Sequence, residues 1–385
     1  MLSILDAARK SIRRMAALAG LTLAAACTTA GGPTVDTNAP VPVALLVPAG
    51  SAQAGDDLLA RSLQNAAQLA IADLGEVRID LRVYPTGGQP GQAQAAALQA
   101  IDEGAKIILG PVFAQEANAV GAAAAPRGIN VLAFSNNPAI AGGNVFILGP
   151  TFQNTAQRLG GYAVRQGKGR ILIVSDQNAA GEAGAAAIRQ GVAAAGGSVV
   201  GAQSYEFSQN GIVQAVPAIT AAARSSGADA LFLTADTAGA LPLLSQLLRE
   251  NGLAASQFIG LTRWDIPAAT MALPGVQEGW FALPDPSLFN QFTSRYMAAY
   301  GEAPHPIAGL AYDGIAAIGA LTKQGQSGAL TGAALTQAQG FVGVSGIFRL
   351  RSDGTNERGL AVAKISNNQV VVIEPAPRSF GGAGF

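Results

Sequence analysis

The sequence contains one cysteine, Cys27, and one histidine, His305. A single cysteine excludes a disulfide within the chain, and this inventory cannot supply the Cys and His clusters that bind zinc. His305 lies between Pro304 and Pro306, which predicts a loop in which the imidazole is structural rather than a catalytic base. A Gly-x-Ser-x-Gly nucleophile elbow is also missing, since the nearest candidate, 343–346, has the wrong spacing. We therefore expect a protein without enzymatic activity, cofactor or bound metal.

Charge is scarce and balanced: 12% of the residues are charged, with 24 basic and 24 acidic side chains. Without a basic excess, the chain offers no electrostatic footprint for nucleic acid. Hydrophobic residues make up 49% of the sequence, which excludes a disordered chain. Beyond residue 26, no apolar run approaches the roughly 20 residues that a membrane-spanning helix needs. The composition favours a folded protein long enough for two domains.

The N-terminal segment has the parts of a bacterial secretory signal. Four cations lie between residues 9 and 14, an uncharged apolar run covers 15–26, and small residues precede Cys27. This arrangement resembles a lipoprotein signal, in which residues 1–26 are removed and Cys27 carries the lipid. A plain secretory signal with an incidental cysteine is the alternative. Thr28 in the second mature position favours the outer membrane, and 27–40 would be a flexible tether on its periplasmic side.

Short apolar segments alternate with helical patterns along the rest of the chain, which is typical of a parallel sheet covered by helices on both faces. The first series of expected strands is 43–47, 79–84, 106–111 and 130–134, with helices at 59–74 and 93–103. A second series has strands at 170–175, 198–205, 230–234 and 258–261, with helices at 182–195, 213–225 and 238–251. Two similar series predict two lobes of like architecture. After them we expect helices at 288–300 and 307–322, and an antiparallel hairpin of 346–350 with 360–373.

The order of elements and several segments resemble the leucine/isoleucine/valine-binding branch of the type I periplasmic binding proteins. The segments that carry the resemblance are ILGPVFAQEANAV at 108–120, GINVLAFSNNPAIAGGNVFILGPT at 128–151, DQNAAGEAGAAAIRQGV at 176–192 and RYMAAYGEAPHPIAGLAYDGIAAIGAL at 295–321. Within that branch, the GP-F turn and the FSNNPA loop look similar to the alphaproteobacterial lipoproteins known as penicillin-binding protein activators.

This resemblance implies an α/β fold of two lobes, each a parallel sheet flanked by helices, joined by three crossover segments. The chain would cross at 149–152, 283–288 and 341–346. The first lobe would hold 41–150 and 285–342, the second 151–284 and 343–375, with a C-terminal tail at 376–385.

In open parallel sheets, ligands bind beyond the carboxyl ends of the strands. The loops that follow the expected strands, together with the resemblance, give these candidate ligand-binding residues: Phe113, Ser135, Asn136, Asn137, Asp176, Asp236, Arg263 and Trp264. The alternative for 135–137 is a polar turn before Pro138, and for 263–264 it is surface packing. Ala114 and Ala180 stand where the amino-acid-binding branch has Ser and Tyr. These departures make a standard free amino acid a poorer candidate for the ligand.

Two non-enzymatic functions follow from the resemblance. The favoured one is a penicillin-binding protein activator, a lipoprotein whose partner is a peptidoglycan synthase. The alternative is a solute-binding protein that delivers an amino acid or another small polar ligand to the permease of an ABC importer. Both would face the periplasm and be held to a membrane by the lipid on Cys27.

Overall fold

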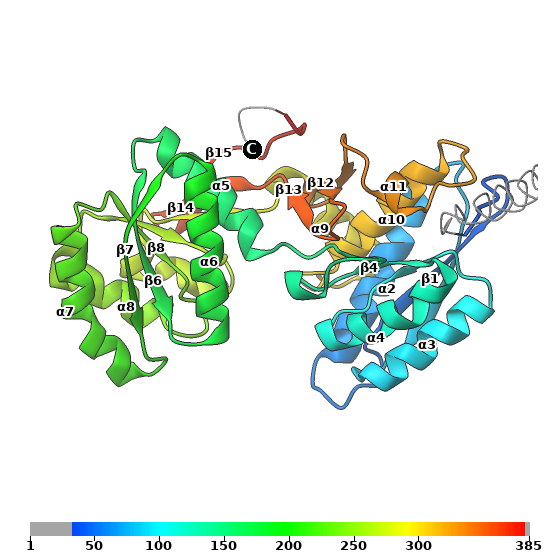
Figure 1. Ribbon diagram of the computed structural model, residues 1–385, viewed down its shortest axis with the longest axis horizontal. Coiled ribbons are helices and arrows are strands. Elements are labelled where there is room, and N and C mark those ends of the chain that lie inside the picture. Colours follow the sequence, from blue (N-terminus) through cyan, green and yellow to red (C-terminus); the bar gives the residue numbers. More distant parts are fainter. Residues whose placement is uncertain (1–32, 382–385) are drawn as a thin grey trace, which may run out of the picture.

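The structure is a computed structural model that describes residues 33–381, so the predicted signal segment and Cys27 lie outside the described residues. It has two lobes joined by a narrow region (Figure 1). The first lobe contains a parallel sheet in the order β2-β1-β3-β4-β5. Its strands are β1 (Val41–Val47), β2 (Ile79–Pro85), β3 (Ile107–Leu109), β4 (Asn130–Ala133) and β5 (Val145–Ile147).

Helices cover both faces of this sheet, because its central strands are apolar on both sides. Val43 and Leu45 of β1 face one hydrophobic cluster, and Ala44 and Leu46 face another. The first cluster is completed by α2 (Asp56–Asp73), α9 (Pro286–Tyr300), α10 (Gly309–Thr322) and α11 (Gly332–Leu335). The second is completed by α3 (Pro90–Asp102) and α4 (Ala114–Ala124).

The second lobe is built around a sheet in the order β15-β14-β10-β9-β8-β6-β7. Its parallel strands are β6 (Arg170–Asp176), β7 (Ser198–Tyr205), β8 (Ala230–Leu233), β9 (Gln257–Gly260) and β10 (Trp280–Leu283). The antiparallel β14 (Ala361–Ser366) and β15 (Gln369–Glu374) extend it. One face is covered by α5 (Phe152–Arg165) and α6 (Ala179–Ala194), the other by α7 (Gln209–Ser225) and α8 (Leu241–Leu248).

The C-terminal region differs from the sequence-based expectation. A three-stranded antiparallel sheet is formed by β11 (Phe341–Gly343), β12 (Gly346–Leu350) and β13 (Asn356–Arg358). The predicted pairing of 346–350 with 360–373 is therefore wrong, and the C-terminal hairpin is β14 with β15. Phe348 packs in the core of the first lobe, so 343–358 lies with that lobe and the third crossing falls near 358–361. The sequence indicated a strand at 346–350, but the apolar residues of a strand carry no information on which strand is its partner.

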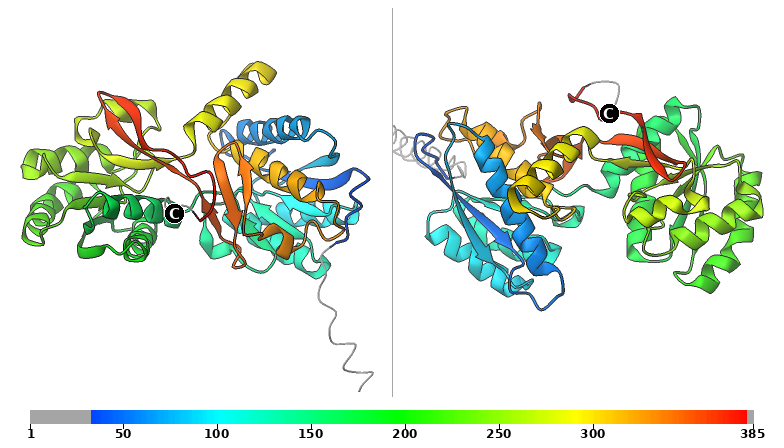
Figure 2. Two further views of the ribbon diagram at one scale, coloured as in Figure 1. Left: turned by 90° about the horizontal axis from the view of Figure 1, so that it is seen from above. Right: turned by 180° about the vertical axis from the view of Figure 1, so that it is seen from behind.

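The three connecting segments run between β5 and α5, between β10 and α9, and between β13 and β14, and Figure 2 shows them gathered between the lobes. Two of them are tied together by buried hydrogen bonds. Asn356 Nδ2 donates to the carbonyl oxygens of Ile147 (2.9 Å) and Gly149 (2.8 Å). Arg358 Nε donates to the carbonyl oxygen of Leu148 (2.9 Å). The first and third connecting segments thus form one bonded unit.

Candidate functional site

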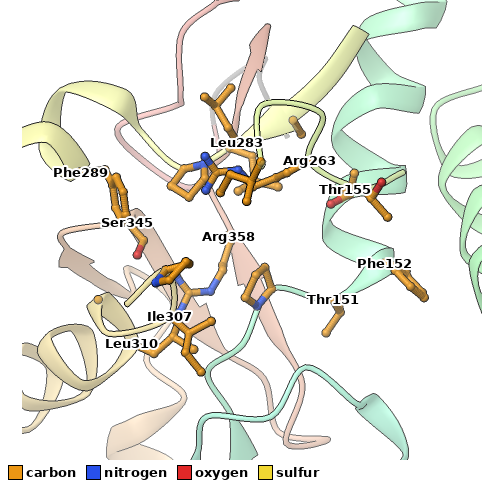
Figure 3. Close-up of a pocket in the computed structure, with 18 of the residues that line it drawn as sticks. Thr151, Phe152, Thr155, Arg263, Leu283, Phe289, Ile307, Leu310, Ser345 and Arg358 are labelled. Atoms are coloured by element: carbon orange, nitrogen blue, oxygen red, sulfur yellow. The ribbon is translucent and has the colours of Figure 1, made fainter. Parts of the chain in front are cut away.

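A cavity of about 250 Å³ lies between the lobes, next to the hinge. Figure 3 shows side chains from both lobes converging on it. Its apolar lining comes from Pro150, Phe152, Leu261, Ile266, Ala282, Leu283, Pro284, Phe289, Pro306, Ile307, Leu310 and Leu360. Its polar lining comes from Thr151, Thr155, Thr262, Arg263, Ser345 and Arg358. Apolar walls with a few convergent polar groups are what small-molecule sites have in common.

Helix α5 begins at the cavity, and the local sequence explains why. Thr151 is its N-cap: Thr151 Oγ1 accepts from the backbone N–H of Asn154 (3.2 Å), and Asn154 Oδ1 accepts from that of Thr151 (2.9 Å). This reciprocal capping box fixes the first turn. It places Thr155, one turn further along, at the cavity wall.

Two guanidinium groups border the cavity, Arg263 after β9 and Arg358 on β13 (Figure 3). Arg263 Nε donates to Asp265 Oδ1 (2.9 Å), and Arg358 Nη1 donates to Asp313 Oδ2 (3.1 Å). Neither carboxylate lines the cavity. The cavity therefore meets the cationic member of each pair, while the anionic member lies behind it.

The pair of Arg358 with Asp313 is the most deeply buried ion pair among residues 33–381, with side chains 3% and 0% exposed. Asp313 Oδ1 also accepts from the backbone N–H of Val344 (2.8 Å). Burial raises the pKa of Asp313, and the charge of Arg358 opposes that rise. Nε and Nη2 of Arg358 both donate to the Leu148 carbonyl, so this side chain holds the first and third connecting segments together.

Of the residues predicted from the sequence, Arg263 is the one that lines this cavity. Trp264 is 0% exposed and packs inside the second lobe, with its ring 6.5 Å from that of Phe281. Placing Trp264 on the cleft wall was therefore wrong. The reason is space: Gly260 and Gly279 have no Cβ, and the indole fills the slot between them.

The predicted residues of the first lobe form a self-contained turn. Ser135 is buried, and its Oγ accepts from the backbone N–H of Asn137 (3.2 Å). Asn137 Oδ1 in turn accepts from the N–H of Ala139 (3.0 Å) and caps a short 3₁₀ helix. Asn136 is exposed, as is Phe113 at the start of α4. The contacts of 135–137 are those of a polar turn before Pro138, which was the alternative interpretation. A role of these residues in ligand binding stays a prediction.

Asp176 and Asp236 follow β6 and β8 at the carboxyl edge of the second sheet. Asp176 is 7% exposed and accepts a hydrogen bond from the Tyr205 hydroxyl. Burial, followed by the charge of Asp236, raises the pKa of Asp176 to about 6. Asp176 lines a separate polar depression between β6, β7 and α6, whereas Asp236 is exposed. Neither carboxylate lines the cavity at the hinge.

Sequence reasoning missed Thr155, Ser345, Arg358 and the apolar residues of the cavity. Thr151 could have been found, because it ends the GPT segment at the first crossing. No sequence pattern marks Ser345 or Arg358 as part of a site, because the pairing of β11, β12 and β13 brings them to the cavity.

His305 lies in a loop, as its flanking prolines predict. Its backbone N–H donates to Ser62 Oγ (2.7 Å), and its Nδ1 accepts from the N–H of Ile307 (3.4 Å). Burial lowers the pKa of the imidazole, which favours the neutral form. In the described residues, no three His, Cys, Asp or Glu side chains gather as a metal site.

Comparison with protein families matches residues 40–369 to a model described as periplasmic binding protein. No curated protein matches the sequence. In residues 33–381, none of the helices has both the length and the apolarity to span a membrane.

Solved structures share the fold at low sequence identity. One, from Rhodospirillum rubrum, is ascribed to a branched-chain amino acid ABC transporter; it has a TM-score of 0.73 and 18% identity, over 87% of this chain and 100% of that one. An ABC transporter substrate-binding protein from Desulfitobacterium hafniense in complex with Leu has a TM-score of 0.64 and 18% identity, over 87% of this chain and 100% of that one. A solute-binding protein of an ABC transporter from Rhodopseudomonas palustris BisB5, in complex with 3,4-dihydroxybenzoic acid, has a TM-score of 0.60 and 18% identity, over 88% of this chain and 96% of that one.

Proposed function

Since the chain belongs to the periplasmic binding protein family, we propose that it is the solute-binding component of an ABC importer. The observation that carries the proposal is the cavity between the lobes, because both lobes and all three connecting segments contribute to its wall. A solute bound there would touch both lobes at once and favour their approach. The similar structures are transport components, which supports the importer over the peptidoglycan synthase activator favoured from the sequence.

The hinge suits this role because two of its three segments are fastened to each other through buried side chains. Arg358 and Asn356 fasten the third connection to the first through backbone carbonyls. Arg158 of α5 extends this link, since its Nε donates to the Leu360 carbonyl (2.6 Å) and its Nη1 pairs with Glu374 (2.5 Å). The second connection, 283–286, carries none of these bonds. Closure would therefore pivot about the bonded pair of segments.

Ligand binding tests the proposal directly. Freshly purified protein is examined by native mass spectrometry for a bound small molecule, and a solute library is screened by thermal shift. Ligand that binds only the folded state stabilises it by RT ln(1 + [L]/Kd), about 2.7 kcal/mol at a hundredfold excess over Kd. We expect at least one solute to raise the melting temperature.

A matched pair of variants locates the site. Thr155→Tyr would fill the cavity and abolish the shift, whereas Gln214→Tyr, on the exposed part of α7, would leave it intact. A protein that co-purifies with no small molecule, binds no solute and instead retains a peptidoglycan synthase from a membrane extract would contradict the importer and restore the activator.

The family places the protein in the periplasm, and we propose that a lipid on Cys27 holds it to a membrane. Cys27→Ser should leave the protein either uncleaved or released into the soluble periplasmic fraction. Wild-type protein recovered as a soluble periplasmic species with a free thiol would contradict lipidation without affecting the binding role.

A further inference from the structure

We propose that the cavity takes an organic carboxylate with an apolar body and no ammonium group, such as a short aliphatic or aryl-substituted acid, in preference to an α-amino acid. This inference rests on the proposed function and specifies its substrate class. It is carried by the charges and surfaces of the residues that line the cavity.

The first step is the sign of the charge at the wall. The lining residues, all within 33–381, include two guanidinium groups and four hydroxyl side chains but no carboxylate. A desolvated ammonium needs a counter-charge, because an unpaired buried charge costs several kcal/mol. Asp265 and Asp313 are the carboxylates paired with the two lining arginines, and each is already neutralised by its own arginine. The wall therefore accommodates an anion and lacks a partner for a cation.

The second step is the donor that remains available. Arg358 directs Nε and Nη2 to the Leu148 carbonyl and Nη1 to Asp313, so each of its three nitrogens already has an acceptor within the protein. Arg263 directs Nε and Nη2 to Asp265, which leaves Nη1 for another acceptor. Its side chain is 30% exposed and lies along the upper side of the cavity in Figure 3. A carboxylate there would receive a charge-assisted hydrogen bond from Arg263.

The third step is the body of the ligand. Phe289 and Ile307 of the first lobe lie across the cavity from Phe152 and Thr155 of the second (Figure 3). With Leu283 above, these side chains surround a volume of about 250 Å³. Such walls favour a compact apolar group, and they offer few partners for a sugar or another solute with many hydroxyl groups.

Matched ligand pairs test the inference by isothermal titration calorimetry on the full mature chain. Leucine is compared with 4-methylpentanoate, and phenylalanine with 3-phenylpropionate; the members of each pair differ only by the ammonium group. We expect the acid of at least one pair to bind at least tenfold more tightly than its amino acid.

Variants give the same test from the side of the protein. Arg263→Gln should weaken the acid at least tenfold. Arg189→Gln, on the exposed face of α6 away from the cavity, is the matched control and should bind like the wild type. Thr155→Asp would add the missing carboxylate and should shift the preference of the pair toward the amino acid. Circular dichroism and the melting temperature establish that each variant is folded.

The outcomes separate the inference from the proposed function. Tighter binding of leucine or phenylalanine than of the matched acid would overturn the inference and leave the binding role intact. The same holds if a neutral solute binds in the cavity and neither acid does. If no solute binds and none co-purifies, the proposed function fails and the inference fails with it.

Discussion

Removal of Arg358 should destabilise the protein strongly and in a pH-dependent way. In Arg358→Met, the side chain keeps much of its apolar volume beside Phe348, whose ring centroid is 5.1 Å from the guanidinium carbon. The substitution leaves Asp313 fully buried without its counter-charge. Breaking a buried ion pair in this way costs about 3–5 kcal/mol. The free energy of unfolding should fall by this amount at pH 8.

The carboxyl group can reduce that cost by taking up a proton. Burial already raises the pKa of Asp313 in the presence of Arg358, and without the guanidinium the pKa must rise further. In the unfolded chain the pKa of this carboxyl group is about 3.9. Between these two values the folded variant binds more protons than the unfolded chain, so its stability increases as the pH falls. The deficit of the variant relative to the wild type should therefore narrow between pH 8 and pH 5.

Urea denaturation followed by far-UV circular dichroism at pH 8 and pH 5 measures both effects. The matched control is Arg61→Met, which removes an exposed ion pair with Glu302, whose side chains are 57% and 37% exposed. Its cost should stay below about 1 kcal/mol and change little with pH. A deficit under about 1 kcal/mol for Arg358→Met at pH 8, or one that widens toward pH 5, would refute the reasoning.

Three further variants test other parts of the structure. Because the pKa of Asp176 is raised to about 6, its negative charge destabilises the folded state at neutral pH. Asp176→Asn should therefore raise the free energy of unfolding by about 1–2 kcal/mol at pH 7.5, and this gain should vanish by pH 4. Urea denaturation at the two pH values measures the difference. Thr151→Ala removes the cap of α5 and should cost about 1 kcal/mol by the same assay. Gly191→Ala would place a Cβ 2.6 Å from the backbone of Ala156 at the α5–α6 crossing, so it should cost about 1–3 kcal/mol and lower the melting temperature.

The sequence was sufficient for the two series of strands and helices and for the two-lobed α/β fold, because buried parallel strands are apolar throughout and easily recognised. The sequence was not sufficient to predict which strands pair with each other in the C-terminal region. Strand 346–350 is buried at four of its five residues, so its pattern does not identify a partner; its pairing with β11 and β13 goes with the packing of Phe348 into the first lobe. The same pairing brings Ser345 and Arg358 to the cavity, so the error in topology and the omission of these residues have one cause.

The sequence locates a loop that follows directly from its strand, but it does not determine the direction in which each side chain of that loop points. Arg263 and Trp264 are adjacent after β9, and both were expected to face the cleft. Two glycines decide otherwise for Trp264: a Cβ at Gly260 or at Gly279 would lie 2.2 Å from the indole ring. Gly279 is distant in sequence from the loop, so the local pattern carries no sign of the slot.

The burial of Trp264 has a consequence for Arg263. With the indole fixed in the core of the second lobe against Phe281, the loop cannot rotate about its axis without expelling a large apolar side chain. Arg263 is therefore held on the outer side of the loop, where its pair with Asp265 orients the guanidinium along the cavity. Trp264 thus acts as the anchor of Arg263, whose role as a ligand contact stays a prediction. The orientation of Arg263 depends on a hydrophobic slot, so a Cβ at Gly260 should disturb ligand binding through Arg263 without touching the cavity.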